Sequence, residues 1–536
     1  MWAAPSDRRQ RMKRSTKMAR RHKLTPAGRT VIFLIVLALV AAAGFFGIKF
    51  LTNGDGVSLP GSSDNGLKTT IGASKIDSND ETINLSLDEW IGWKPIIDAN
   101  GGTSTASGSI FDQLGLKVNI HVINDAEASS NALIKGELNG AGYTTNRAAF
   151  LSGKFNDAGL DVVMPVFTNY SNGGDGIIAT SKINSVEDLV DAKIAVPKYS
   201  EAHTLVAWFV NKSDLTKEQK DKIINNLTLL DDPEQCGQAF FSGKVDVAAT
   251  WQPYLSNAEN STDSHILFDT RASKTLIMDG IVFRKDWAEA NQDTVTKFIE
   301  GILKANLSYT TNFDTIRAVL PMVADSSDED IKAMCGDAEL MNYASMEKTL
   351  NETAPMMFRD MCEIWTSLGE AVDSSAADTM FDSKYLMPLK DQYSSIADKA
   401  ETTTAKLSEE KKAETIDAAA LMTKTSTVTF VPNTAKFMDN AEADESLRSF
   451  VEIAKVLDGT IIQIEGNINS RNGVEGGQEL SESRAKTVAN YFIANGIDAG
   501  RIITVGNDNR KMLVDPDAPG CEINRRTDVF FKVIEE

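Results

Sequence analysis

The stretch that decides the fold is FSGKVDVAATWQP, residues 241–253. Its apolar part, Val245–Ala249, has the length of a short buried strand, and a polar and aromatic Thr-Trp-Gln run follows it directly. Strand-like runs of this kind alternate with helical patterns from about residue 82 to about residue 400. Such alternation predicts an α/β architecture with mostly parallel sheets.

The surrounding sequence supplies the other expected elements. Two helix starts, at Ser185 and Thr216, carry a polar residue at the third position that suits a capping box. The expected strands are Thr82–Leu87, Lys117–Ile123, Asp161–Phe167, Gly176–Ala179 and Lys193–Val196, and the clearest expected helices are Ser200–Asn211 and Thr216–Asn226.

Several segments in fixed order carry a family resemblance. They are LIKGELNGAG (133–142), GGDGIIAT (173–180), INSVEDL (183–189), KIAVP (193–197) and the stretch 241–253. Together they resemble periplasmic solute-binding proteins of the nitrate, taurine and thiamine-precursor type. The resemblance implies a two-lobed, type II-like binding module, with DGIVF (279–283) as the strand that returns to the first lobe. It also implies a small anion or anionic organic solute as ligand and an ABC permease as partner.

The candidate ligand site lies between the two lobes, because ligands of open α/β sheets bind at the carboxyl ends of strands and near helix N-termini. Free N–H groups after Ser200 suit an anion. Ser200 has the alternative role of a helix cap, and Trp93 and Trp251 that of packing residues. The candidate ligand-binding residues are Trp90, Trp93, Thr144, Thr145, Tyr199, Ser200, Trp251 and Asp279.

A second module follows a polar stretch, 401–425. Its expected strands are Thr427–Val431, Thr460–Gly466, Arg501–Val505 and Thr527–Val533, with helices at Ala441–Leu457 and Ser481–Asn495. The runs LSESRAKTV (480–488), GI (496–497) and NRRTDV (524–529) resemble the OmpA-like peptidoglycan-associating domain, a small α+β fold.

That resemblance implies a peptidoglycan site at Asn469, Ser481, Arg484 and Arg526. In the family, a carboxylate and the arginine matched by Arg484 grip diaminopimelate. Asn469 stands where the carboxylate is usual, and a charge-assisted hydrogen bond is roughly twice as strong as a neutral one. Wall binding is therefore expected to be weakened, altered toward another peptide, or lost.

The N-terminus predicts a membrane anchor. Val31–Ile48 contains 18 residues without a charge, which span about 27 Å as a helix, close to a bilayer's hydrocarbon thickness. Ten Lys and Arg precede it, so the N-terminus is expected in the cytoplasm. The alternative is a signal peptide cleaved near Ala41. The expected divisions are a basic cytoplasmic arm (1–30), transmembrane helix (31–50), flexible linker (51–80), solute-binding module (81–400), linker (401–425) and OmpA-like domain (426–536).

Charge and composition exclude other classes. The chain has 536 residues and a net charge of −20, and after Arg29 its 45 basic residues face 74 acidic ones, which argues against nucleic-acid binding. No catalytic constellation, cofactor motif or metal-ligand cluster is evident among its four cysteines and four histidines. The sequence thus predicts a single-pass protein of the cytoplasmic membrane, not an enzyme, with its bulk outside the cytoplasm. The alternatives are an envelope scaffold that tethers the wall and a ligand sensor without a transport role.

Overall fold

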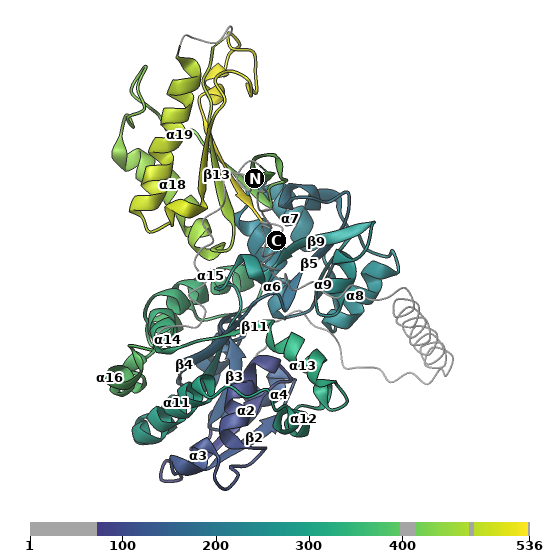
Figure 1. The fold of residues 1–536 in the computed structure, drawn as a ribbon, viewed down its shortest axis with the longest axis vertical. Helices are drawn as coiled ribbons and strands as arrows, with labels where there is room; N and C mark the ends of the chain where they lie inside the picture. Colours follow the sequence, from purple (N-terminus) through teal and green to yellow (C-terminus); the bar gives the residue numbers. More distant parts are fainter. Residues whose placement is uncertain (1–71, 397–413, 471–475, 534–536) are drawn as a thin grey trace, which may run out of the picture. The chain divides into compact units, whose positions relative to one another are not determined.

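The computed structural model describes residues 72–396, 414–470 and 476–533 (Figure 1). The predicted membrane segment, Val31–Ile48, lies outside these residues. Within the described ranges, no helix has both the length and the apolar character needed to cross a membrane.

The first lobe is built on a six-stranded sheet with the order β11-β4-β10-β3-β1-β2. β1 runs parallel to β2 and β3, whereas β10 runs antiparallel to β3 and β4. The strands are β1 (Ile83–Leu87), β2 (Val118–Val122), β3 (Gly140–Thr144), β4 (Val162–Ser171), β10 (Met278–Arg284) and β11 (Ala338–Leu340).

Helices cover this sheet and bury its apolar face (Figure 1). α11 packs on α2, and α15 packs along α5. The longer helices are α2 (Lys94–Asn100), α4 (Ala126–Lys135), α5 (Thr145–Ala158), α11 (Gln292–Leu307) and α15 (Ala354–Ser367). The shorter ones are α3 (Ile110–Gln113), α10 (Lys285–Ala290), α12 (Asp314–Val319), α13 (Asp328–Cys335), α14 (Tyr343–Lys348) and α16 (Lys390–Tyr393).

The second lobe contains a five-stranded sheet with the order β7-β6-β8-β5-β9. Its strands are β5 (Asp175–Thr180), β6 (Ile194–Pro197), β7 (Thr228–Leu230), β8 (Val247–Trp251) and β9 (Ser264–Asp269). Its helices are α6 (Glu201–Lys212), α7 (Lys217–Asn225), α8 (Pro233–Phe241) and α9 (Tyr254–Glu259). The capping boxes expected at Ser185 and Thr216 are both present.

Both sheets are mixed, which corrects the prediction of mostly parallel sheets. The chain leaves the first lobe through β4 and returns to it through β10, and these two strands are neighbours in the sheet. Because one strand leads out of the lobe and the other leads back into it, they run in opposite directions. The return of the chain at residues 279–283 is confirmed by the position of β10 between β3 and β4.

The ordered first lobe begins earlier than the expected boundary at residue 81. The backbone N–H of Ser74 donates to the carbonyl of Ile134 at 2.8 Å, and the guanidinium of Arg284 donates to the carbonyl of Ser74 at 2.8 Å. The indole of Trp287 donates to the carbonyl of Asp80 at 2.8 Å. The polar composition of this segment suggested a free tether, but its backbone carbonyls are bound by side chains of the lobe.

The C-terminal module has a four-stranded sheet with the order β12-β15-β13-β14. The first strand predicted, Thr427–Val431, is wrong: the pairing segment is Met422–Ser426, which begins inside the expected linker, and Phe430 forms only an isolated bridge with Phe437. The other elements lie within a few residues of their expected positions. They are β12 (Met422–Ser426), β13 (Ile461–Gly466), β14 (Ile502–Gly506), β15 (Thr527–Lys532), α18 (Asn440–Val456) and α19 (Gly477–Ala494).

Candidate functional site

The first part of the candidate site follows β1. The carboxylate of Asp88 accepts a hydrogen bond from the indole N–H of Trp93 at 2.6 Å and one from the backbone N–H of Trp90 at 3.3 Å. Trp93 is buried against Gly142, where a Cβ would lie 2.8 Å from the indole ring. Trp93 is therefore a packing residue, the alternative that the sequence left open beside ligand contact. Its indole also holds Asp88 in place.

Trp90 lies where the chain crosses between the lobes. Its indole N–H donates to the side-chain oxygen of Asn169 at 3.0 Å, and the amide of Asn169 donates to the carbonyl of Gly92 at 3.1 Å. A Cβ at Gly174, just before β5, would lie 2.9 Å from the Trp90 ring. Trp90 is half-buried.

Asp279 lies in the middle of the first sheet, on β10. It stands opposite Thr144 of β3 and Asn169 of β4. Its side chain is only 3% exposed, and its Oδ2 has no hydrogen-bond partner among the described residues. Burial raises the pKa of Asp279 well above its ordinary value, and the charges of Asp88, Glu201 and Asp175 raise it further.

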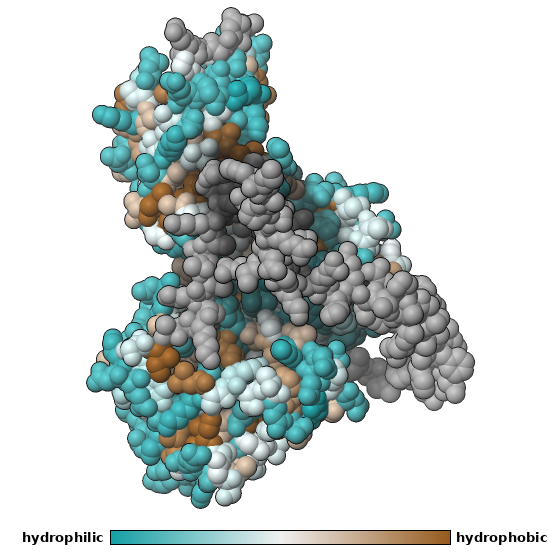
Figure 2. All heavy atoms as spheres, viewed as in Figure 1, coloured by the Kyte–Doolittle hydropathy of each residue, from teal (hydrophilic) through white to brown (hydrophobic). Residues whose placement is uncertain are grey.

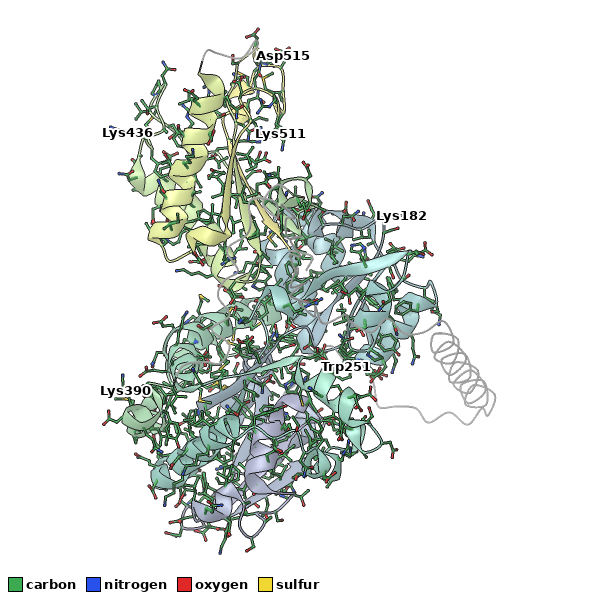
Figure 3. All side chains as sticks on the ribbon, viewed as in Figure 1. Lys182, Trp251, Lys390, Lys436, Lys511 and Asp515 are labelled. Atoms are coloured by element: carbon green, nitrogen blue, oxygen red, sulfur yellow. The ribbon has the colours of Figure 1, made fainter. Side chains whose placement is uncertain are left out.

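Asp175 begins β5 in the second lobe. Its Oδ2 accepts a hydrogen bond from the hydroxyl of Ser171 at 2.8 Å, and its backbone stands opposite Trp251 of β8. Burial raises the pKa of Asp175 to about 7, and the charges of Glu201 and Asp88 add to this rise. Trp251 is 40% exposed at the end of its strand (Figure 3).

An ion pair joins the two lobes. Arg147, in the first turn of α5, donates from Nε and Nη2 to the two carboxylate oxygens of Glu201 at 3.0 and 2.8 Å. Thr144 caps α5 and donates its hydroxyl to Glu201 at 2.8 Å. Glu201 is the first residue of α6. Burial raises the pKa of Glu201, but the charge of Arg147 outweighs burial and holds this pKa below its ordinary value.

The remaining candidates lie around the start of α6. The side chain of Ser200 accepts from the backbone N–H of His203 at 3.2 Å, which is the capping role that was its alternative. Tyr199 stacks on Phe150 with ring centroids 5.1 Å apart. Thr145 is buried, and its hydroxyl has no partner within the described part of the chain.

The structure therefore brings Trp90, Thr144 and Asp279 together at the crossing and places Trp251 across from Asp175. It also reveals four charged residues absent from the sequence-based set: Asp88, Arg147, Asp175 and Glu201. Two of them had a usable signal, because Asp88 directly follows the first predicted strand and Asp175 directly precedes the fourth. They were missed because the family resemblance implies an anionic ligand, and carboxylates are not expected to bind an anion.

In the C-terminal module, the four candidate wall-binding residues are held by internal hydrogen bonds. The amide of Asn469 donates to the carbonyl of Pro516 at 3.1 Å and accepts from Asn524 at 3.0 Å. Ser481 accepts from the backbone N–H of Asp508 at 3.0 Å, and Arg526 donates to Asp528 at 3.0 Å. Ser481 and Arg526 are buried and support the fold.

Arg484 is buried, although the resemblance implies that it contacts peptidoglycan. It is 9% exposed, it donates to the carbonyl of Thr434 at 3.1 Å, and its guanidinium lies 4.9 Å from the ring centroid of Phe430. The segment that contains Phe430 and Thr434 covers it. Burial lowers the pKa of Arg484, and the nearby charge of Arg525 lowers it further.

Metal and disulfide chemistry have no obvious location in the described ranges. No three His, Cys, Asp or Glu side chains there converge closely enough to hold a metal ion. All four cysteines are free thiols, of which Cys236 and Cys362 are buried.

Two α/β lobes are connected by two crossing strands, and polar side chains of both lobes meet at the crossing. Residues 89–324 match the NMT1-like family, and residues 429–526 match the OmpA family. Both resemblances inferred from the sequence are thereby confirmed.

Solved structures of this fold are similar to the chain at low identity. The periplasmic aliphatic sulphonate-binding protein SsuA of Escherichia coli has 17% identity and a TM-score of 0.43, covering 57% of this chain and 98% of its own. The periplasmic nitrate-binding protein NrtA of Synechocystis has 10% identity and a TM-score of 0.42, covering 60% of this chain and 90% of its own. A comparison with curated proteins gave no match.

Proposed function

We propose that this chain is an extracytoplasmic solute-binding protein that captures a small solute between its lobes and delivers it to an ABC permease. The observation that carries the proposal is the meeting of Thr144 and Arg147 of the first lobe with Glu201 of the second. Groups from two lobes that are linked by two crossing strands can close around a ligand by a hinge motion. Its role is binding and not catalysis.

The proposal includes an envelope anchor. The apolar segment Val31–Ile48 and the ten basic residues before it support a single membrane helix with the N-terminus in the cytoplasm. The OmpA family match at residues 429–526 supports association with peptidoglycan. Because Asn469 offers no charge, this association is weak.

The direct test is a binding screen on the full-length protein in non-ionic detergent. A small solute of one chemical class should raise the unfolding temperature and should change tryptophan emission, because Trp90 lies at the crossing between the lobes. If anionic, cationic and neutral solutes all leave both signals unchanged, the capture proposal fails.

A scaffold that tethers the wall is the second candidate, and one observation favours it. The carboxylate of Glu201 fills the position beside Arg147 that a bound anion would take. In a scaffold, the lobes would stay closed on their own side chains without any solute. The same screen separates the two candidates, since a scaffold would respond to no solute.

A further inference from the structure

The charges at the crossing between the lobes are strongly one-sided. We call Asp88, Asp175, Glu201 and Asp279 the acidic cluster. Asp279 stands opposite Thr144, which donates to Glu201, and opposite Asn169, which accepts from the indole of Trp90. The backbone N–H of Trp90 donates to Asp88, and Ser171, which lies two residues after Asn169 on β4, donates to Asp175. Arg147 is paired with Glu201. The other three carboxyls form no ion pair with any residue that the structure describes.

The position most attractive to an anion is already filled. The N-terminus of α5, capped by Thr144, and the guanidinium of Arg147 would both favour negative charge. Glu201 occupies them with three hydrogen bonds, two from Arg147 and one from Thr144. A solute anion would have to displace this carboxylate and then lie among three further acidic side chains.

Asp279 gives independent evidence for a missing partner. A carboxyl group that is 3% exposed and has an oxygen without a described hydrogen-bond partner is costly, so such oxygens are normally satisfied. Asp88, Glu201 and Asp175 lie near enough to Asp279 for their charges to raise its pKa. A ligand with an N–H donor would satisfy the oxygen, whereas a quaternary ammonium has no hydrogen to donate.

Aromatic rings accompany these acids. Trp90 is half-buried beside Asp279, and Trp251, which is 40% exposed, is the residue of β8 opposite Asp175. A cation over the face of an indole ring is stabilised by the negative charge of that face. Acids that supply charge and indoles that supply flat apolar surface suit an organic cation.

We propose that the acidic cluster binds a small organic cation whose ammonium or guanidinium N–H groups donate to Asp279 and its neighbouring carboxylates, instead of the anion that the family resemblance implies. This inference rests on the proposed capture function and names the class of solute captured at the same site.

The test is isothermal titration of the full-length protein in non-ionic detergent at low salt. The probes are 1,4-diaminobutane and agmatine, with choline as the cation that lacks N–H donors at its charged nitrogen, and methanesulfonate and nitrate as anions. We expect a diamine or guanidinium probe to bind at least tenfold more tightly than choline, and the anions to give no heat.

Variants connect the signal to the cluster. Asp279→Asn keeps the shape of a protonated carboxyl, so it should fold, and it should weaken the amine at least tenfold. Asp175→Asn, at a half-buried position, should weaken it in the same direction. Asp157→Asn is the matched control, because Asp157 is exposed on α5 and outside the cluster.

The outcomes are distinguishable. If an anion binds and neither amine does, the cation inference is overturned while solute capture stands. If the amine binds equally well to wild type and Asp279→Asn, the cluster is not its site. Binding of Ca²⁺ or Mg²⁺ without any amine binding overturns the organic cation in favour of a metal ion. If no probe of any charge binds, both proposals fail.

Discussion

Removing the internal anion should change which solutes the protein binds. Glu201→Ala deletes the carboxylate that accepts two hydrogen bonds from Arg147 and one from Thr144. The side chains of Arg147 and Glu201 are 21% and 16% exposed, so solvent screens the pair in part. Charge-assisted hydrogen bonds are worth about 1.5–3 kcal/mol, and we expect stability to fall by roughly the lower half of that range after screening.

The vacated guanidinium and the N-terminus of α5 should then bind a small anion. An affinity near 1 mM, which corresponds to about −4.1 kcal/mol, is a reasonable expectation for one guanidinium and one helix end. The assay is thermal unfolding of the full-length variant with and without methanesulfonate, followed by titration calorimetry.

Two controls make this result interpretable. Glu259→Ala removes an exposed carboxylate on α9 and should leave anion binding unchanged. The double variant Glu201→Ala, Arg147→Ala should lose the new anion site. The reasoning is refuted if wild type binds methanesulfonate as tightly as Glu201→Ala does, because Glu201 would then not block the site.

Three further predictions concern protons, the wall and the membrane. Asp175 has a pKa of about 7 in the folded chain against 3.8 for an ordinary Asp, so the folded state binds a proton that the unfolded state has released. This group should therefore make the ligand-free protein less stable as pH rises from about 4 to 7. Unfolding of wild type and Asp175→Asn at several pH values measures the effect, and a contribution of Asp175 that increases stability over this pH range would contradict it. Asn469→Asp should strengthen binding to purified sacculi about ten- to hundredfold, as expected for a charge-assisted contact of about 1.5–3 kcal/mol. Equal pull-down of wild type and Asn469→Asp would argue against Asn469 as the weak half of the site. N-terminal sequencing should find Val31–Ile48 retained, and a mature chain that starts near Ala43 would show cleavage instead.

The sequence predicted the elements of this fold where local chemistry determines them. The helix expected at Ala441–Leu457 is α18, Asn440–Val456, and the capping boxes at Ser185 and Thr216 are present. The directions of β4 and β10 follow from the path between the lobes and not from any local pattern, so the mixed sheets could not be read in advance. The prediction of a strand at Phe430 was wrong because Phe430 pairs only with Phe437, in an isolated bridge. Alternation of apolar and polar residues does not show whether a neighbouring strand is available for pairing.

The sequence predicted where several candidate residues lie along their strands and helices, but not the charges that lie around them. Thr144, Ser200 and Trp251 do lie at a helix or strand end, as expected from the strand pattern. The pairing of Arg147 with Glu201 joins residues 54 positions apart, and the isolation of Asp279 depends on three separate strands. Long-range contacts of this kind determine whether a site attracts a cation or an anion, and residue order alone does not contain them.

The bonds that hold residues 74–80 to the first lobe have a mechanical consequence. Ser74 and Asp80 are bound by Arg284 and Trp287, at the end of β10 and in α10. Residues 74–80 are therefore attached to the first lobe, at the end of β10 and at α10. In the proposed hinge motion, the first lobe would stay fixed relative to residues 74–80, and the second lobe, which carries Asp175 and Glu201, would move relative to them.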